Sequence, residues 1–115
     1  MSVTVRTYSN FINGEWTPSK SGKTASSLNP ANKNEVVGRY QLSEASDLDA
    51  AAEAAKKAAR HWARMSGAAR GDLLFKAAQI LENRLEEIAE TMTREMGKTY
   101  PEATGETARG GALVR

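Results

Sequence analysis

The sequence contains no cysteine among its 115 residues. This absence excludes a disulfide scaffold, a cysteine-ligated zinc site and a cysteine nucleophile within the chain. Aromatic residues make up only 6% of the sequence. The commonest apolar residue is alanine, whose side chain buries little area, so we expect a thin core.

Long apolar runs are also missing. No stretch approaches the roughly 18 apolar residues that a membrane-spanning helix requires. The first residues lack the apolar segment of a secretory signal. We therefore expect a cytoplasmic protein with no membrane partner.

Charge of one sign does not dominate. The net charge is +2 with 26% charged residues, and lysine and arginine are spread along the whole length. A nucleic-acid-binding domain usually gathers its basic residues on one face or helix. The sequence therefore predicts no nucleic-acid partner.

Residues 1–42 have the pattern of short strands and turns. Two β-prone runs, residues 8–12 and 15–17, flank Asn13-Gly14, the dipeptide that best adopts a two-residue type I′ turn. This pattern predicts a β-hairpin. Further strands are predicted at residues 24–28, before the Asn29-Pro30 step, and at residues 35–42.

From Ser46 onward the apolar period changes from two residues to about 3.6, which predicts helices. Ser46 with Asp49 has the spacing of a capping box at the start of the first helix. Ser66 is a candidate cap for a second helix, and Asn83 with Glu86 a candidate cap for a restart after a bend.

The last predicted helix follows a glycine stop. Gly97 suits the position just after a helix end, where a left-handed residue is common. Pro101 suits the first turn of a new helix, and Thr99 with Glu102 has capping-box spacing. The chain then ends on an apolar Ala112-Leu113-Val114-Arg115 segment, from which we expect part of a larger protein cut within a helix.

Two Gly-Lys-Thr triplets, residues 22–24 and 97–99, invite a phosphate-loop interpretation. Such a loop also needs a glycine five residues before its second glycine, and those positions hold Thr17 and Met92. Gly105, Gly110 and Gly111 likewise have the wrong spacing for a dinucleotide loop and follow a predicted helix. We expect no cofactor-binding residue in this chain.

The single histidine, His61, has Arg64 and Met65 where a metal-binding helix would place a second ligand. We therefore expect it to be a partly exposed helix-end residue. No residue of the chain is predicted to be catalytic.

Several segments occur in an order and spacing that resemble the N-terminal portion of the aldehyde dehydrogenase superfamily. They are Phe11-Ile-Asn-Gly-Glu-Trp16, Leu28-Asn-Pro-Ala31, Glu35-Val-Val-Gly38, Trp62, Ala69-Arg70, Glu95-Met-Gly-Lys98 and Pro101-Glu-Ala103. Residues 94–110 look most like the branch that oxidises ketoglutarate semialdehyde and related semialdehydes.

The resemblance implies an α/β parent fold with a Rossmann-like NAD(P)-binding domain. Residues 1–42 would form its N-terminal β-arm and residues 43–115 its first three or four helices. The parent would be a homo-oligomeric oxidoreductase that uses NAD or NADP to convert an aldehyde or semialdehyde to a carboxylate.

The reaction implied by the resemblance begins with attack of a cysteine thiolate on the aldehyde. The family's cysteine, general-base glutamate, oxyanion-hole asparagine and cofactor-contacting lysine match no position here. We therefore expect the 115-residue chain to be inactive alone and to bind no cofactor.

The resemblance also implies a structural monovalent cation. Many family members bind one with a backbone carbonyl before the Asn-Pro step and an acidic side chain before the Gly-Lys turn. The matching positions are Leu28, together with Ser27, and Glu95. Many members carry aspartate at the acidic position, so this site would differ by one methylene.

A second interpretation remains open. The alanine-rich and leucine-rich stripes of the predicted helices could belong to an independent helical interaction module without catalysis. Ordered monomers would favour that module, whereas exposed apolar surface and self-association would favour an incomplete dehydrogenase.

Overall fold

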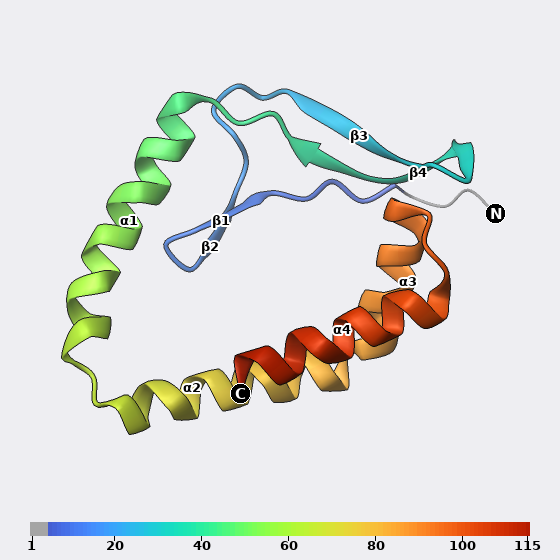
Figure 1. Cartoon of the computed structure of the whole chain (residues 1–115). Helices are drawn as coiled ribbons and strands as arrows, with labels where there is room; N and C mark the ends of the chain where they lie inside the picture. Colours follow the sequence, from blue (N-terminus) through green and yellow to red (C-terminus); the bar gives the residue numbers. More distant parts are fainter. Residues whose placement is uncertain (1–4) are drawn as a thin grey trace. The chain divides into compact units, whose positions relative to one another are not determined.

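The computed structural model describes residues 5–115, which form four strands followed by four helices (Figure 1). This order agrees with the predicted β-arm followed by helices. No helix within these residues is long and apolar enough to cross a membrane.

The first two strands form the predicted hairpin. Strand β1 (Asn10–Ile12) pairs antiparallel with β2 (Glu15–Thr17), and Phe11 lies opposite Trp16. Asn13 and Gly14 both have positive φ, 55° and 82°, as a type I′ turn requires. The rings of Phe11 and Trp16 are 4.9 Å apart and tilted by 51°, a favourable cross-strand aromatic pair.

We expect Gly14→Val to lower the free energy of unfolding by roughly 1 kcal/mol or more, because a β-branched residue rarely adopts a positive φ. A Cβ at Gly14 would meet no heavy atom within 4 Å, so the cost comes from backbone conformation and not from crowding. Urea denaturation of Gly14→Val and the parent measures the change in the free energy of unfolding. Gly71→Ala, which also adds a Cβ in open space but on a helix, should not destabilise. Equal midpoints for Gly14→Val and the parent would remove this interpretation.

The other two predicted strands are also present. Strand β3 (Thr24–Asn29) pairs with β4 (Asn32–Gln41) in a separate two-stranded sheet. The turn between them holds Pro30 and Ala31, and the Asn29 side chain accepts a hydrogen bond of 2.9 Å from the Ala31 amide. Because the turn is this short, β4 begins at Asn32, earlier than the sequence pattern indicated.

Helix α1 (Ala45–Arg64) begins before the predicted cap. The proposed Ser46–Asp49 capping box is wrong, because Ser46 already lies in the first helical turn. The Asp47 carboxylate instead accepts a hydrogen bond of 2.9 Å from the Glu44 amide, just before the helix. An acidic side chain in this turn also complements the positive end of the helix dipole.

Helix α2 (Gly67–Asn83) begins at the predicted cap, since the Ser66 hydroxyl accepts a bond of 3.1 Å from the Ala69 amide. The predicted restart exists, but its cap does not. Helix α3 (Leu85–Met96) follows Arg84, whose φ is −110°, and no side-chain hydrogen bond caps it. Asn83 is still helical, so its side chain cannot serve as the predicted cap.

The stop after α3 and the start of α4 (Tyr100–Val114) are confirmed. Gly97 is left-handed, with φ 74° and ψ 12°. Thr99 and Glu102 form a complete capping box, in which the Glu102 carboxylate accepts bonds from the Thr99 hydroxyl, 2.8 Å, and amide, 3.1 Å. These hydrogen bonds hold the pKa of Glu102 below its ordinary value, and the bond from the Thr99 hydroxyl has the larger effect.

The chain divides into two compact units. One contains the residues up to Leu28 together with Lys33–Arg64, and the other contains Asn29–Asn32 together with Met65–Arg115. These units are not the predicted domains. The boundary between a β-arm of residues 1–42 and a helical part of residues 43–115 refers to the domains of the whole parent protein, and it stays a prediction.

The core of the helical unit consists of small side chains. Helix α4 packs along both α2 and α3 (Figure 1). Ala78, Ala89 and Ala103, one from each helix, are fully buried, and no large side chain of residues 5–115 is fully buried. The predicted thin core is therefore confirmed, since alanine lets helices approach closely but removes little apolar area from water.

Candidate functional site

The three predicted cation ligands lie in different elements. Ser27 and Leu28 belong to β3, and Glu95 lies in the last turn of α3. Ser27 is half-buried, whereas the other two are exposed. Among the described residues, no group of three or more histidine, cysteine, aspartate or glutamate side chains could hold a metal ion. A site built on backbone carbonyls is not such a group, so the cation site stays a prediction.

The residues that resembled phosphate loops have structural roles. In the second triplet, Gly97 ends α3, Lys98 pairs with Glu106 at 2.7 Å, and Thr99 caps α4. In the first triplet, Gly22 has a φ of 65° in the turn before β3. Their interpretation as a helix stop and a loop is confirmed.

The glycines of the last segment do not fit a dinucleotide. Gly105, Gly110 and Gly111 all lie inside α4, which follows α3 and not a strand. A dinucleotide loop needs a strand, a glycine-rich turn and then a helix N-terminus. The described chain therefore offers no such loop. His61 is exposed in the last turn of α1, as expected.

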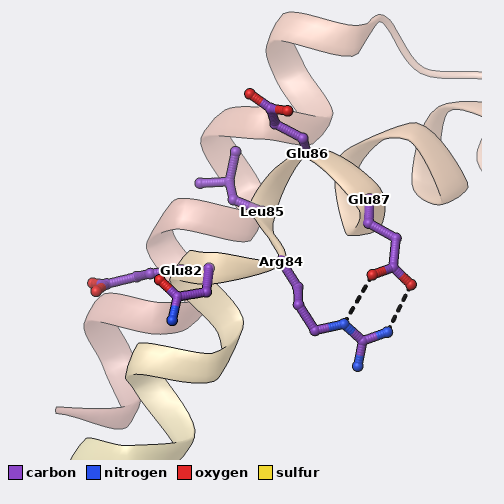
Figure 2. A pocket seen from close by; sticks show the side chains of 6 residues that line it. Glu82, Arg84, Leu85, Glu86 and Glu87 are labelled. Atoms are coloured by element: carbon purple, nitrogen blue, oxygen red, sulfur yellow. Dashed lines mark hydrogen bonds and ion pairs between the residues drawn. The ribbon is translucent and has the colours of Figure 1, made fainter.

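A surface depression of about 580 Å³ lies at the break between α2 and α3. Figure 2 shows its charged lining, where the Arg84 guanidinium donates to both Glu87 oxygens at 2.9 and 2.6 Å. Glu82, in the same lining, pairs with Arg115 at 2.5 Å. These hydrogen bonds to Glu87, together with the charge of its carboxylate, raise the pKa of Arg84. Exposed pairs of this kind contribute little stability, and the lining holds no serine, threonine, cysteine, lysine or histidine.

A second depression, of about 450 Å³, lies between the β1–β2 hairpin and α1. The hairpin side consists of Phe11, Ile12, Asn13 and Gly14, and the helix side consists of Ala51, Ala54, Ala55 and Ala58. No titratable side chain lines it. It is an apolar groove and supplies no acid, base or nucleophile.

The most enclosed polar cluster joins the segment after β2 to the start of α1. Ser19 is 5% exposed and Asp47 is 6% exposed. The Ser19 hydroxyl donates to the Asp47 carboxylate at 2.6 Å, and the Lys20 amide donates to the same group at 3.2 Å. Bonds from the Glu44 amide and then from Ser19 lower the pKa of Asp47, so the carboxylate is ionised at neutral pH.

This cluster is not a nucleophilic site. A serine nucleophile needs a general base whose pKa lies near the working pH, and a path to substrate. The lowered pKa makes Asp47 a weak base, and Ser19 is buried. Sequence reasoning missed the cluster, because 28 residues separate Ser19 from Asp47 and no local pattern connects them.

The family model described as the aldehyde dehydrogenase family matches residues 16–115 of this chain. Among curated proteins, the chain is 55% identical over 109 residues to an alpha-ketoglutaric semialdehyde dehydrogenase of Bacillus subtilis, covering 95% of this chain and 22% of that protein. It is 44% identical over 100 residues to an alpha-ketoglutarate semialdehyde dehydrogenase of Haloferax volcanii, covering 87% of this chain and 21% of that protein.

Comparison with solved structures also finds aldehyde dehydrogenases. A crystal structure of an NAD-dependent aldehyde dehydrogenase from Sinorhizobium meliloti superimposes with a TM-score of 0.91 at 36% identity. The superposition covers 96% of this chain and 22% of that one. The chain therefore spans about a fifth of the length of the proteins that it matches.

Proposed function

The chain belongs to the aldehyde dehydrogenase family, and we propose that it supplies the N-terminal part of an NAD(P)-dependent enzyme that oxidises an aldehyde or semialdehyde to a carboxylate. The observation that carries this proposal is the family match over residues 16–115 together with 55% identity to a semialdehyde dehydrogenase. It favours the enzyme over an independent helical interaction module.

We propose that the substrate is a short semialdehyde that carries a carboxylate at its other end. Two relatives act on alpha-ketoglutarate semialdehyde by name, and a further one, from Geobacillus kaustophilus, is a malonate-semialdehyde dehydrogenase with 42% identity over 110 residues. Both named substrates combine an aldehyde and a carboxylate. The part of the chain described here contributes no residue that we assign to recognition of either group.

The test begins with the coding sequence beyond Arg115. If it encodes a cysteine-bearing continuation, the complete protein should reduce NAD or NADP with carboxylate-bearing semialdehydes, and should act less well on aldehydes of equal length without the carboxylate. Absorbance of the reduced cofactor follows the reaction. A complete protein that reduces neither cofactor with any aldehyde would overturn the proposal.

We expect no aldehyde oxidation by the 115-residue chain itself. It has no cysteine to form the thiolate, and its glycines do not build a dinucleotide loop. Purified chain incubated with NAD or NADP and a panel of short aldehydes should give no reduced cofactor above the protein-free control. Turnover that co-purifies with the chain through two different columns would contradict this expectation.

The remaining proposals concern the whole protein. We propose that it works as a cytoplasmic homo-oligomer with NAD or NADP bound by residues outside this chain. A monovalent cation at the positions of Ser27, Leu28 and Glu95 belongs to the same proposal. Its support is the resemblance of these positions to the family pattern.

A further inference from the structure

Asp47 joins two segments that are distant in the sequence. Its carboxylate accepts bonds from the Ser19 hydroxyl and the Lys20 amide on one side, and from the Glu44 amide on the other. The first two donors follow β2, and the third precedes α1. Because the group is 6% exposed, water has little access to replace these donors.

The same segment is also tied to the end of β4, but by uncharged groups. The Ser19 amide donates to the Gln41 side chain at 2.9 Å, and the Ser21 hydroxyl donates to the Leu42 carbonyl at 2.7 Å. The Leu42 amide donates to the Lys23 carbonyl at 2.9 Å. These bonds can hold the segment beside β4 after its tie to α1 has been removed.

We propose that Asp47 is a charge-dependent latch, whose ionised carboxylate holds residues 19–21 on the first turn of α1. When its charge is removed, the segment separates from α1, and the helix itself stays folded. The bonds to the Ser19 hydroxyl and the two amides require an acceptor, and an ionised carboxylate accepts more strongly than a neutral group.

The surroundings favour the ionised form. The Lys20 side chain adds a favourable charge from the latched segment, and Glu44 contacts the carboxylate through its backbone amide. Asn10 and Ser43, which bond to each other at 2.8 Å beside this region, are uncharged. Because the pKa of Asp47 is lowered, its contribution to stability is present at neutral pH and is lost as the pH falls through the lowered value.

The experiment compares Asp47→Asn with Asp49→Asn by amide hydrogen exchange at neutral pH. Asp49 lies on α1 two residues further on and is exposed, so its substitution removes the same charge near the same helix end. For Asp47→Asn we expect exchange of the Lys20 amide, which donates to Asp47, to rise by roughly tenfold or more, because its opening no longer breaks a charge-assisted bond. The Ser19 amide stays bonded to Gln41 and should change less. Asp49→Asn should exchange like the parent, and the amides of residues 51–58 should be unchanged in both variants.

Ser19→Ala provides a second variant that keeps the carboxylate. It removes one donor to Asp47 and leaves the carboxylate that the Lys20 amide uses, so we expect a smaller rise in the exchange of the Lys20 amide. Trypsin cleavage after Lys20 should follow the same order among the variants. Unchanged exchange of the Lys20 amide in Asp47→Asn would overturn the latch. Loss of protection in residues 51–58 together with that segment would also overturn it, because Asp47 would then serve the helix as a whole.

Discussion

Replacing Gly97 with alanine is expected to lower the free energy of unfolding by about 2–4 kcal/mol, the sum of a backbone cost and a packing cost. Gly97 has a φ of 74°, where an L-residue is strained by about 1 kcal/mol. An added Cβ would also lie 2.7 Å from Cγ of Pro30 and 3.7 Å from its Cβ. A contact of 2.7 Å is too short, so either the turn between β3 and β4 or the end of α3 must shift.

Urea denaturation of Gly97→Ala and the parent measures this loss. Gly105→Ala is the matched control, because a Cβ at Gly105 meets no heavy atom within 4 Å and the residue is helical. The control should match or exceed the parent in stability. Pro30→Ala removes the crowded Cγ, so Gly97→Ala should cost less in that background. A cost that is equal in both backgrounds would show that crowding at Pro30 contributes nothing.

Gly97 illustrates which parts of the fold can be predicted from the sequence. Its role depends on the α3 residues just before it and on a backbone angle that glycine adopts easily. The Asn13-Gly14 turn, the Ser66 cap and the Thr99–Glu102 box are likewise interactions within about four residues. Local rules are sufficient for such features, and each of these predictions was confirmed.

The Ser19–Asp47 contact was missed because its partners are 28 residues apart and no local pattern connects them. The α1 cap was misplaced for a local reason, because Asp47 accepts from the Glu44 amide whereas the sequence pattern placed the cap at Ser46. The start of α3 has no capping side chain at all, and its first turn carries the Arg84–Glu87 ion pair. The predicted restart is present, but the Asn83–Glu86 cap on which that prediction rested is not.

The candidate site was predictable only in what it lacks. The sequence has no cysteine, and in the described part of the chain Gly105, Gly110 and Gly111 lie inside α4 and not in a turn between a strand and a helix. Positive assignments such as Glu95 come from the resemblance to a family. Ligation by backbone carbonyls leaves no signal in side-chain identity, so the sequence pattern alone could not establish it.

The leucine-rich stripe of α2 and α3 leads to the second large expected effect. Its residues, at alternating three- and four-residue spacing on the predicted helices, include Leu74, Leu81, Leu85, Ile88 and Met92. Part of the stripe is covered within the chain, because α4 packs on both helices and leaves Leu81, Leu85 and Ile88 half-buried. Helix α2 has further apolar side chains outside that contact. Leu73 and Ile80 are 44% and 57% exposed and, seven residues apart, lie on one side of the helix, while Phe75 is 52% exposed.

We therefore expect the isolated chain to self-associate. Full burial of one leucine, isoleucine or phenylalanine side chain contributes roughly 1.5–3 kcal/mol, so several such side chains on one helix favour contact with a second copy. Light scattering should show an average mass that rises with concentration over a roughly hundredfold range. The double variant Leu73→Lys, Ile80→Lys should shift the chain toward the monomer, whereas Gln79→Lys, which adds a charge at an exposed position of α2 without removing an apolar side chain, should do so less. A constant monomer mass for the parent, with no binding of a hydrophobic dye, would contradict the prediction, because the intrachain packing of α4 would then be sufficient to keep the helices soluble and separate.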